Sequence, residues 1–182
     1  MKKIIRFGLP LLILVAIGGG WLLFHQQPQQ QPTKPAKTAV KTKPKYRSLT
    51  RAELNRSPKL KYCSIVYYAI KHSKIQRWQE VSNFDLGWQL EQYPITDGTK
   101  VLVWPDMDIK KGAKLVQPNW FALSNTGNVT YHSFVVHSFR DDMTESTDLD
   151  TIIKQLNTDH AAMKVRHMLP NALIVAHKNT AN

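Results

Sequence analysis

The N-terminal stretch constrains this chain more than any other part, because an apolar run is followed there by residues that cannot form a core. A basic head, residues 1–6, leads into 18 uncharged and mostly apolar residues at positions 7–24. A helix rises about 1.5 Å per residue, so this run would span about 27 Å, close to the hydrocarbon thickness of a bilayer. We therefore expect a transmembrane helix at residues 7–24.

The distribution of basic residues predicts the orientation of this helix. Three basic residues lie within residues 1–6, whereas the next one after the apolar run is Lys34. Because short segments rich in Lys and Arg stay in the cytoplasm, residues 1–6 form a cytoplasmic head and the rest of the chain is exported. We expect a signal anchor that crosses a bacterial inner membrane once, with the C-terminal domain in the periplasm.

A cleaved signal peptide is the alternative to a signal anchor. Ala16 and Gly18 form a small-x-small pattern that suits a signal peptidase, and cleavage there would release a soluble periplasmic protein. The apolar run continues beyond this pattern to Phe24, where a cleavage region would already be polar. The anchor is therefore favoured.

Residues 25–47 form a Gln-, Pro- and Lys-rich segment with too few apolar side chains to fold. We expect a disordered linker, kept extended by its prolines, that holds the folded domain away from the bilayer. Its lysines either keep the linker soluble or adhere to anionic lipid or to an anionic envelope polymer.

The net charge of +12 is concentrated in the same part of the chain. Residues 1–56 contain eleven basic residues and one acidic residue, whereas residues 57–182 contain 14 basic and 12 acidic residues. A domain that binds nucleic acid carries its positive charge on a folded face. The distribution therefore predicts no nucleic-acid partner.

Residues 48–178 are predicted to form one folded domain of the α+β class. Thr50 and Ser57 are the expected N-caps of a short helix and a long helix, and the apolar spacing carries the long helix as far as Val81. Alternating apolar residues between turn residues then predict an antiparallel sheet. Its expected strands are at residues 87–92, 100–104, 113–117, 119–124 and 129–139.

An amphipathic helix is predicted after a polar exit from the sheet at residues 140–146. Thr147 is its expected N-cap, its apolar positions repeat as far as His167, and residues 172–176 are expected to form a closing strand. The expected fold is a set of helices packed on a curved antiparallel sheet. Its architecture resembles cystatin-like or NTF2-like domains, including those of type IV secretion scaffolds, and architecture alone does not identify a function.

Motifs that identify a reaction are missing from the sequence. It contains no phosphate loop, GxSxG elbow, HExxH or dinucleotide fingerprint. The pairs His160/His167 and His132/His137 have spacings that do not suit a shared metal ion on a helix or a strand. A single cysteine also argues against a structural zinc site. We expect no metal and no cofactor, and a domain that is not an enzyme.

One enzymatic alternative rests on Cys63. The Tyr-Cys-Ser run at residues 62–64 lies on the expected long helix, and His132 and His137 lie on a later strand. This order resembles the NlpC/P60 peptidases, papain-type enzymes that cut peptidoglycan with a cysteine and a histidine. The resemblance implies a catalytic Cys63 paired with His132 or His137, and it covers only these residues. The sequence departs from the family pattern in two ways: Ile65 stands where the family usually has glycine, and the Gly-Asp that commonly leads the family's sheet is missing.

An acidic cluster before the last helix is the candidate partner-contact surface. Its members share a position in or just ahead of the first turn: Asp141, Asp142, Glu145, Asp148 and Asp150. Carboxylates there also favour the helix dipole, so part of the cluster has a structural explanation. The remainder suits a basic partner or the lysine-rich linker of the same chain.

These features together predict a membrane-anchored, extracytoplasmic protein-interaction domain. A single anchor, a spacer and a small α+β head suit a component of an envelope-spanning assembly, such as a secretion or conjugation system, with other envelope proteins as partners. The alternative is a periplasmic inhibitor or immunity-type module. The natural contact anchors are whichever of three tryptophans face solvent: Trp88, Trp104 and Trp120.

Overall fold

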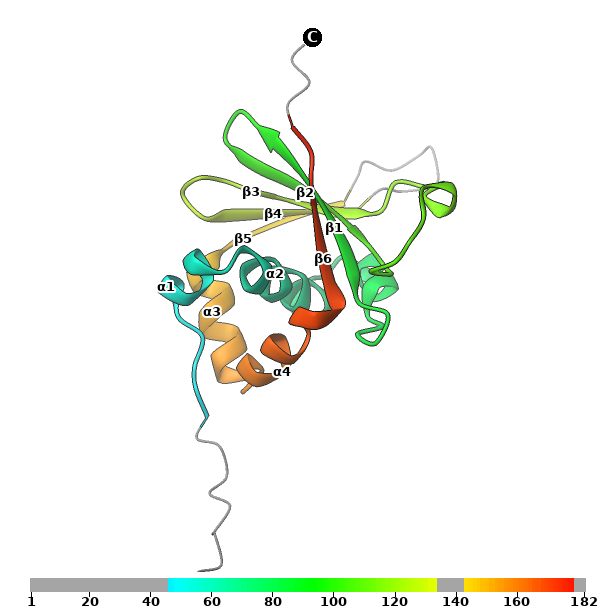
Figure 1. Ribbon diagram of the computed structural model, residues 1–182. Helices are drawn as coiled ribbons and strands as arrows, with labels where there is room; N and C mark the ends of the chain where they lie inside the picture. Colours follow the sequence, from blue (N-terminus) through cyan, green and yellow to red (C-terminus); the bar gives the residue numbers. More distant parts are fainter. Residues whose placement is uncertain (1–45, 134–142, 179–182) are drawn as a thin grey trace, which may run out of the picture. The chain divides into compact units, whose positions relative to one another are not determined.

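The computed structural model describes residues 46–133 and 143–178 (Figure 1). The predictions for residues 1–6, 7–24 and 25–45 therefore lie outside the described residues. Within the two described ranges, the helices are all too short or too polar to cross a membrane.

Two helices open the described part of the chain, and both begin where their capping residues predict. In α1 (Arg51–Arg56) the Thr50 hydroxyl accepts a hydrogen bond from the Glu53 N–H, and in α2 (Pro58–His72) the Ser57 hydroxyl accepts one from the Leu60 N–H at 3.2 Å. Pro58 occupies the first turn, where its missing N–H costs nothing. Nine of the fifteen α2 residues are buried, so this helix forms the centre of the domain.

The prediction of one helix from Ser57 to Val81 is wrong, because α2 ends at His72. Ser73 adopts an extended backbone, its hydroxyl donates to Glu145 Oε2 at 2.7 Å, and the Lys74 N–H donates to the same oxygen at 2.8 Å. The Glu145 carboxylate thus accepts the Lys74 N–H, which would donate to a backbone carbonyl if the helix continued. A short 3-10 helix, η1 (Gln76–Val81), follows.

The sheet has six strands in the order β5-β4-β3-β2-β1-β6. Four neighbouring pairs are antiparallel and the β1–β6 pair is parallel, so the sheet is mixed rather than antiparallel as predicted. In Figure 1 the strands fan out above a layer formed by α1 to α4. The strands are β1 (Trp88–Ile95), β2 (Gly98–Trp104), β3 (Asn119–Leu123), β4 (Asn128–Ser133), β5 (Met143–Asp148) and β6 (Ala172–Ala176).

The sequence misassigns two segments of this sheet. The strand predicted at residues 113–117 is wrong: Ala113 ends a short 3-10 turn, η2 (Lys111–Ala113), and residues 114–117 lie in the loop that follows. Strand β5 occupies most of the predicted polar exit, and it pairs with β4 from Ser133 opposite Met143 to Asn128 opposite Asp148. As an edge strand with no fully buried side chain, β5 lacks the apolar alternation by which a strand is recognised.

The predicted last helix is two helices, α3 (Leu149–Thr158) and α4 (Ala162–His167). Asp148, one residue later than predicted, is the N-cap of α3, and its carboxylate accepts from the N–H groups of Asp150 and Thr151. His160 has φ of +52°, which no residue inside a helix adopts, so the chain reverses direction there. A 3-10 turn, η3 (Leu169–Asn171), then leads into β6, the predicted closing strand.

The core lies between the helical layer and the inner face of the sheet. Tyr131 of β4 is fully buried and donates its hydroxyl to the carbonyl of Ile65 on α2 at 2.9 Å. The Trp88 indole N–H similarly donates to the carbonyl of Val81 at 2.7 Å. These two bonds satisfy polar atoms inside an otherwise apolar interior and fix α2 and η1 against the sheet.

Candidate functional site

Cys63 lies in the middle of the core rather than at an accessible helix start. Its side chain is fully buried on α2, and burial raises the pKa of the thiol to about 12. Lys59, one turn away, opposes this shift only weakly. A reactive cysteine needs the opposite environment, one that is partly exposed and favours the thiolate.

The structure does not bring Cys63 and His132 together. His132 follows Tyr131 on β4, and neighbouring strand residues point to opposite faces of a sheet. Because Tyr131 faces α2, His132 faces the outer side, where its ring stacks on that of Trp120 with centroids 3.5 Å apart. His137, the other candidate base, lies outside the described residues.

The described members of the acidic cluster all have structural contacts. Glu145 accepts the two hydrogen bonds that end α2, and Asp150 pairs with Arg51 at 3.0 Å. Asp148 caps α3, and the backbone N–H of Thr151 is the main cause that lowers its carboxyl pKa. Asp141 and Asp142 lie outside the described residues.

The outer face of the sheet carries a clamp that holds the loop between β2 and β3. Lys114 donates hydrogen bonds to Gln89 Oε1 and Glu91 Oε1 on β1, and its Nζ lies 5.2 Å from the centre of the Trp104 ring. Burial alone would raise the pKa of Glu91, but hydrogen bonds from Lys114 and Tyr93 outweigh it and lower that pKa. A paired lysine and carboxylate, each mostly buried, therefore fix this loop on the sheet.

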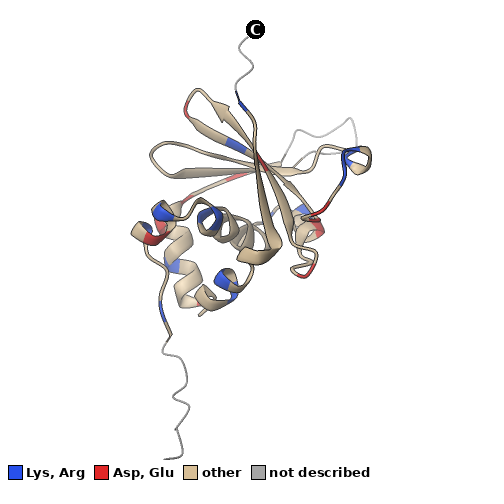
Figure 2. Cartoon of the chain, viewed as in Figure 1, with Lys and Arg blue, Asp and Glu red and all other residues tan. Residues whose placement is uncertain are grey.

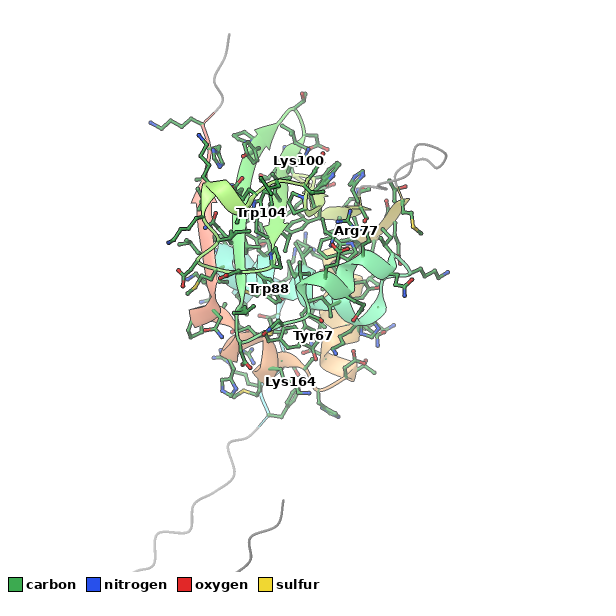
Figure 3. All side chains as sticks on the ribbon, turned by 90° about the vertical axis from the view of Figure 1, so that its right-hand side faces the viewer. Tyr67, Arg77, Trp88, Lys100, Trp104 and Lys164 are labelled. Carbon is green, nitrogen blue, oxygen red and sulfur yellow. The ribbon has the colours of Figure 1, made fainter. Side chains whose placement is uncertain are left out.

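The clamp leaves an apolar pair pointing into solvent. Leu115 is 85% exposed and Val116 is 55% exposed, immediately after the buried Lys114 contact. Two hollows adjoin this pair, one of about 220 Å³ towards η1 and one of about 340 Å³ above Lys100 and Leu102 on β2. Figure 3 faces this part of the molecule, with Trp104 between Lys100 and Trp88.

A buried amide lines the hollow towards η1. Asn119, at the start of β3, is 1% exposed, and its Nδ2 donates to the carbonyl of Arg77 at 2.8 Å. This bond fixes the orientation of the amide, and no described residue donates a hydrogen bond to its Oδ1. The rest of the lining is mainly apolar and includes Val103, Pro105 and Ile109. The hollow therefore combines an apolar wall with a few polar side chains, those of Arg77, Glu80, Gln117 and Asn119.

The three tryptophans differ in what they offer to a partner. Trp88 is buried in the core, and Trp120 is half-buried between His132 and Lys100, whose Nζ lies 4.2 Å from its ring centre. Trp104 is 8% exposed but lines both hollows beside Leu115. Trp104 is therefore the tryptophan that belongs to the candidate contact surface.

Sequence reasoning missed Lys114, Leu115, Val116 and Asn119 as site residues. Residues 113–117 were expected to form a strand, which would have buried one of the two aliphatic side chains. The composition of residues 110–118 indicates a loop rather than a strand. It includes Gly112, Pro118 and lysines at positions 110, 111 and 114.

Charge and composition of the described surface do not single out a metal or polyanion site. Figure 2 shows basic and acidic residues interspersed over helices and strands rather than gathered on one element. Within residues 46–133 and 143–178, no cluster of three or more His, Cys, Asp and Glu residues is placed to hold a metal ion. No protein-family model, curated protein or solved structure matches this chain.

Proposed function

We propose that residues 48–178 form a non-enzymatic protein-interaction domain, anchored outside a bacterial inner membrane by residues 7–24 and spaced from it by residues 25–47. Its contact surface is the Leu115 surface, which we define by Trp104, Leu115, Val116 and the two adjoining hollows. The partners are other envelope proteins of an assembly such as a secretion or conjugation system.

The exposure of Leu115 and Val116 carries this proposal. Single exposed aliphatic residues are common, but here two adjacent ones flank hollows with apolar walls. Lys114 holds them in a defined position, so a partner would not have to order the loop on binding. A preformed surface of this kind binds without the ordering cost of a free loop.

The chemistry of the described residues favours binding over catalysis. Cys63 is enclosed in the core with a raised pKa, and His132 lies on the other side of the sheet. The acidic cluster is a weaker contact candidate than the Leu115 surface, because Glu145, Asp148 and Asp150 already have partners within the domain.

A photo-crosslinking experiment on the full chain in its native cells tests the proposal. A photoreactive phenylalanine at position 115 should give a discrete crosslinked protein in the membrane fraction. The same group at position 173, the site of the 42%-exposed Leu173 on β6, is the matched control and should give none. Changing Val116→Ser should reduce the yield from position 115, because it removes half of the exposed apolar pair.

The identity of the crosslinked protein distinguishes an assembly component from an inhibitor or immunity-type module. A membrane protein that co-purifies in detergent supports an assembly component, whereas a single soluble protein supports an inhibitor or immunity-type module. Equal crosslinking from positions 115 and 173 would remove the Leu115 surface from the proposal.

A further inference from the structure

A separate hollow of about 270 Å³ lies in the helical layer, between α2, the turn before β1 and the end of α4. Figure 3 labels two of its residues, Tyr67 and Lys164, well below Trp104 and Lys100 of the sheet. None of the residues around it belongs to the Leu115 surface. Its lining consists of Tyr67, Lys71, Phe84, Lys164, His167 and Met168.

The floor of this hollow is apolar and aromatic. Tyr67 and Met168 are 6% and 7% exposed, and the rings of Tyr67 and Phe84 stack with their centres 5.7 Å apart. Phe84 also contacts Trp88 edge-to-face at 6.0 Å. A half-buried aromatic ring supported from two sides leaves part of its surface for a ligand.

The turn that carries Phe84 is held rigidly. Asn83 Oδ1 accepts hydrogen bonds from the N–H groups of Asp85 and Leu86, and the Phe84 carbonyl accepts one from Asn171 Nδ2 at 3.0 Å. Gly87 has φ of +68°, and a Cβ there would lie 1.8 Å from the Asn171 carbonyl oxygen. The hollow is therefore preformed and does not depend on a mobile loop.

The rim of the hollow is basic. Lys71, Lys164 and His167 are mainly exposed around the aromatic floor, and the Lys71 Nζ lies 5.8 Å from the Phe84 ring centre. Of the residues that the structure describes, none that lines the hollow carries a carboxylate. Among the described residues, the side chains of Lys164 and His167 form no ion pair or hydrogen bond. The Lys164 ammonium and the His167 ring are thus available to a ligand.

One carboxylate, that of Asp159, acts electrostatically on the floor of the hollow and already has partners within the domain. Asp159 contributes, after burial, to the raised pKa of Tyr67. Its carboxylate is engaged by His72 Nε2 at 2.7 Å and by Gln155 Nε2 at 2.9 Å. Asp159 is therefore held by His72 and Gln155 rather than by Lys71 or Lys164.

We propose that this hollow binds a small amphipathic anion, a phosphate or carboxylate group carried on an aromatic or apolar body. The apolar body of the ligand packs against the exposed part of Phe84, and its anionic group lies between Lys71 and Lys164. The volume is below the 300–1,000 Å³ or so that drug-sized ligands use, which suits a fragment-sized ligand. The inference is independent of the Leu115 surface.

Methionine-methyl NMR of the full chain in phosphatidylcholine nanodiscs tests the proposal, with phenyl phosphate as the probe. The Met168 methyl resonance should shift and saturate with a dissociation constant in about the millimolar range or below. Met107 and Met143, which do not line the hollow, should not shift. Benzyl alcohol and inorganic phosphate should each bind at least about fivefold more weakly, because each lacks one half of the probe.

Charge variants supply the matched comparison. Lys164→Gln should weaken phenyl phosphate binding about fivefold, whereas Lys154→Gln, an exposed lysine on α3 outside the hollow, should leave it unchanged. Thermal unfolding of both variants should match that of the parent chain. The proposal is overturned if benzylamine, the cationic counterpart, shifts Met168 as strongly as phenyl phosphate, or if Lys164→Gln has no effect.

The source of the anion is distinguished by the lipid of the nanodisc. If phosphatidylglycerol shifts Met168 in the absence of phenyl phosphate, the natural ligand is a lipid headgroup. If it does not, and phenyl phosphate still binds, the ligand is a soluble anion.

Discussion

The environment of Cys63 determines its chemistry more than its position in the sequence does. With a pKa of about 12, only about one thiol in ten thousand is ionised at pH 8. The side chain is also fully enclosed, so a reagent reaches it only when the core opens. Both effects act against nucleophilic attack.

Native thiol labelling should therefore be very slow. At pH 8 a disulfide reagent should modify Cys63 at under about one hundredth of the rate for the same protein in denaturant. The reaction can be followed by absorbance, with the denatured chain as the control for full labelling. Rapid labelling of the native protein would contradict the buried position and restore the peptidase alternative.

Two glycines provide a matched pair for testing backbone conformation. Gly98 has φ of +103°, and a Cβ there would lie 2.0 Å from the Leu123 carbonyl oxygen, whereas a Cβ on Gly112 would contact nothing. Gly98→Ala should reduce the free energy of unfolding by about 2 kcal/mol or more, and Gly112→Ala should change it by less than about 0.5 kcal/mol. Urea unfolding followed by tryptophan fluorescence measures both. Similar losses in the two variants would contradict the β1–β2 turn geometry.

Individual residues also show what the sequence could not reveal about the sites. Trp88 and Trp104 lie at the same end of the β1–β2 pair, so their different surroundings depend on which face of the sheet each one occupies and on the loop that Lys114 clamps. The hollow at Phe84 combines residues from α2, a turn and α4, which are separated by up to about a hundred positions. The spacing of apolar residues along the sequence does not predict which distant residues will line one hollow.

Among the elements, α1 and α4 are joined by one ion-pair network. Arg166 donates from Nε to Glu53 Oε1 at 3.1 Å and from Nη2 to Glu53 Oε2 at 2.8 Å. Its Nη1 also donates to the carbonyl of Arg47 at 2.6 Å. The hydrogen bond from Arg166 is the main cause that lowers the pKa of Glu53.

The network should make stability depend on pH in the acid range. Because the folded-state pKa of Glu53 lies below its ordinary value of 4.5, the stabilisation is complete above that value and is lost as the pH falls through the lower folded-state pKa. Glu53→Gln should destabilise the protein by about 1 kcal/mol at pH 7 and by less at pH 3.

Urea unfolding at the two pH values measures this difference. Glu80→Gln is the control, because the Glu80 side chain is 53% exposed and pairs with Arg77 of the same short helix. It should have a smaller effect at pH 7. If the free energies of unfolding of the parent and of Glu53→Gln differ by the same amount at pH 7 and at pH 3, the Glu53–Arg166 ion pair is not the cause of the pH dependence.

Elements with strong local signals were predictable, and those that depend on distant contacts were not. The caps at Thr50 and Ser57 and the hairpin of β3 and β4 are where the sequence places them, and residues 134–139 of the predicted strand at 129–139 lie outside the described residues. The end of α2 depends on Glu145 from a distant strand, and the reversal at His160 interrupts an apolar spacing that continues through it. The parallel partner of β1 has no local signal.

At the scale of the whole domain, the two proposed surfaces lie on different layers. The Leu115 surface belongs to the sheet side, and the basic hollow belongs to the helical layer. A protein partner on one and a small anion on the other would therefore not compete directly. The fold class, α+β with helices on one face of a sheet, follows from the sequence, whereas the mixed strand order does not.

The parallel pairing of β1 with β6 has a consequence for how the domain folds. Trp88 pairs with Ala172, and their separation, 172 minus 88, is 84 residues. A contact across so long a loop forms slowly, because the chain must lose much of its freedom before the strands meet. During that interval β1 has β2 on one side and open backbone groups on the other. Until β6 pairs, the open edge of β1 is thus one place where the nascent domain can aggregate, and in the folded sheet the short strand β6 covers it.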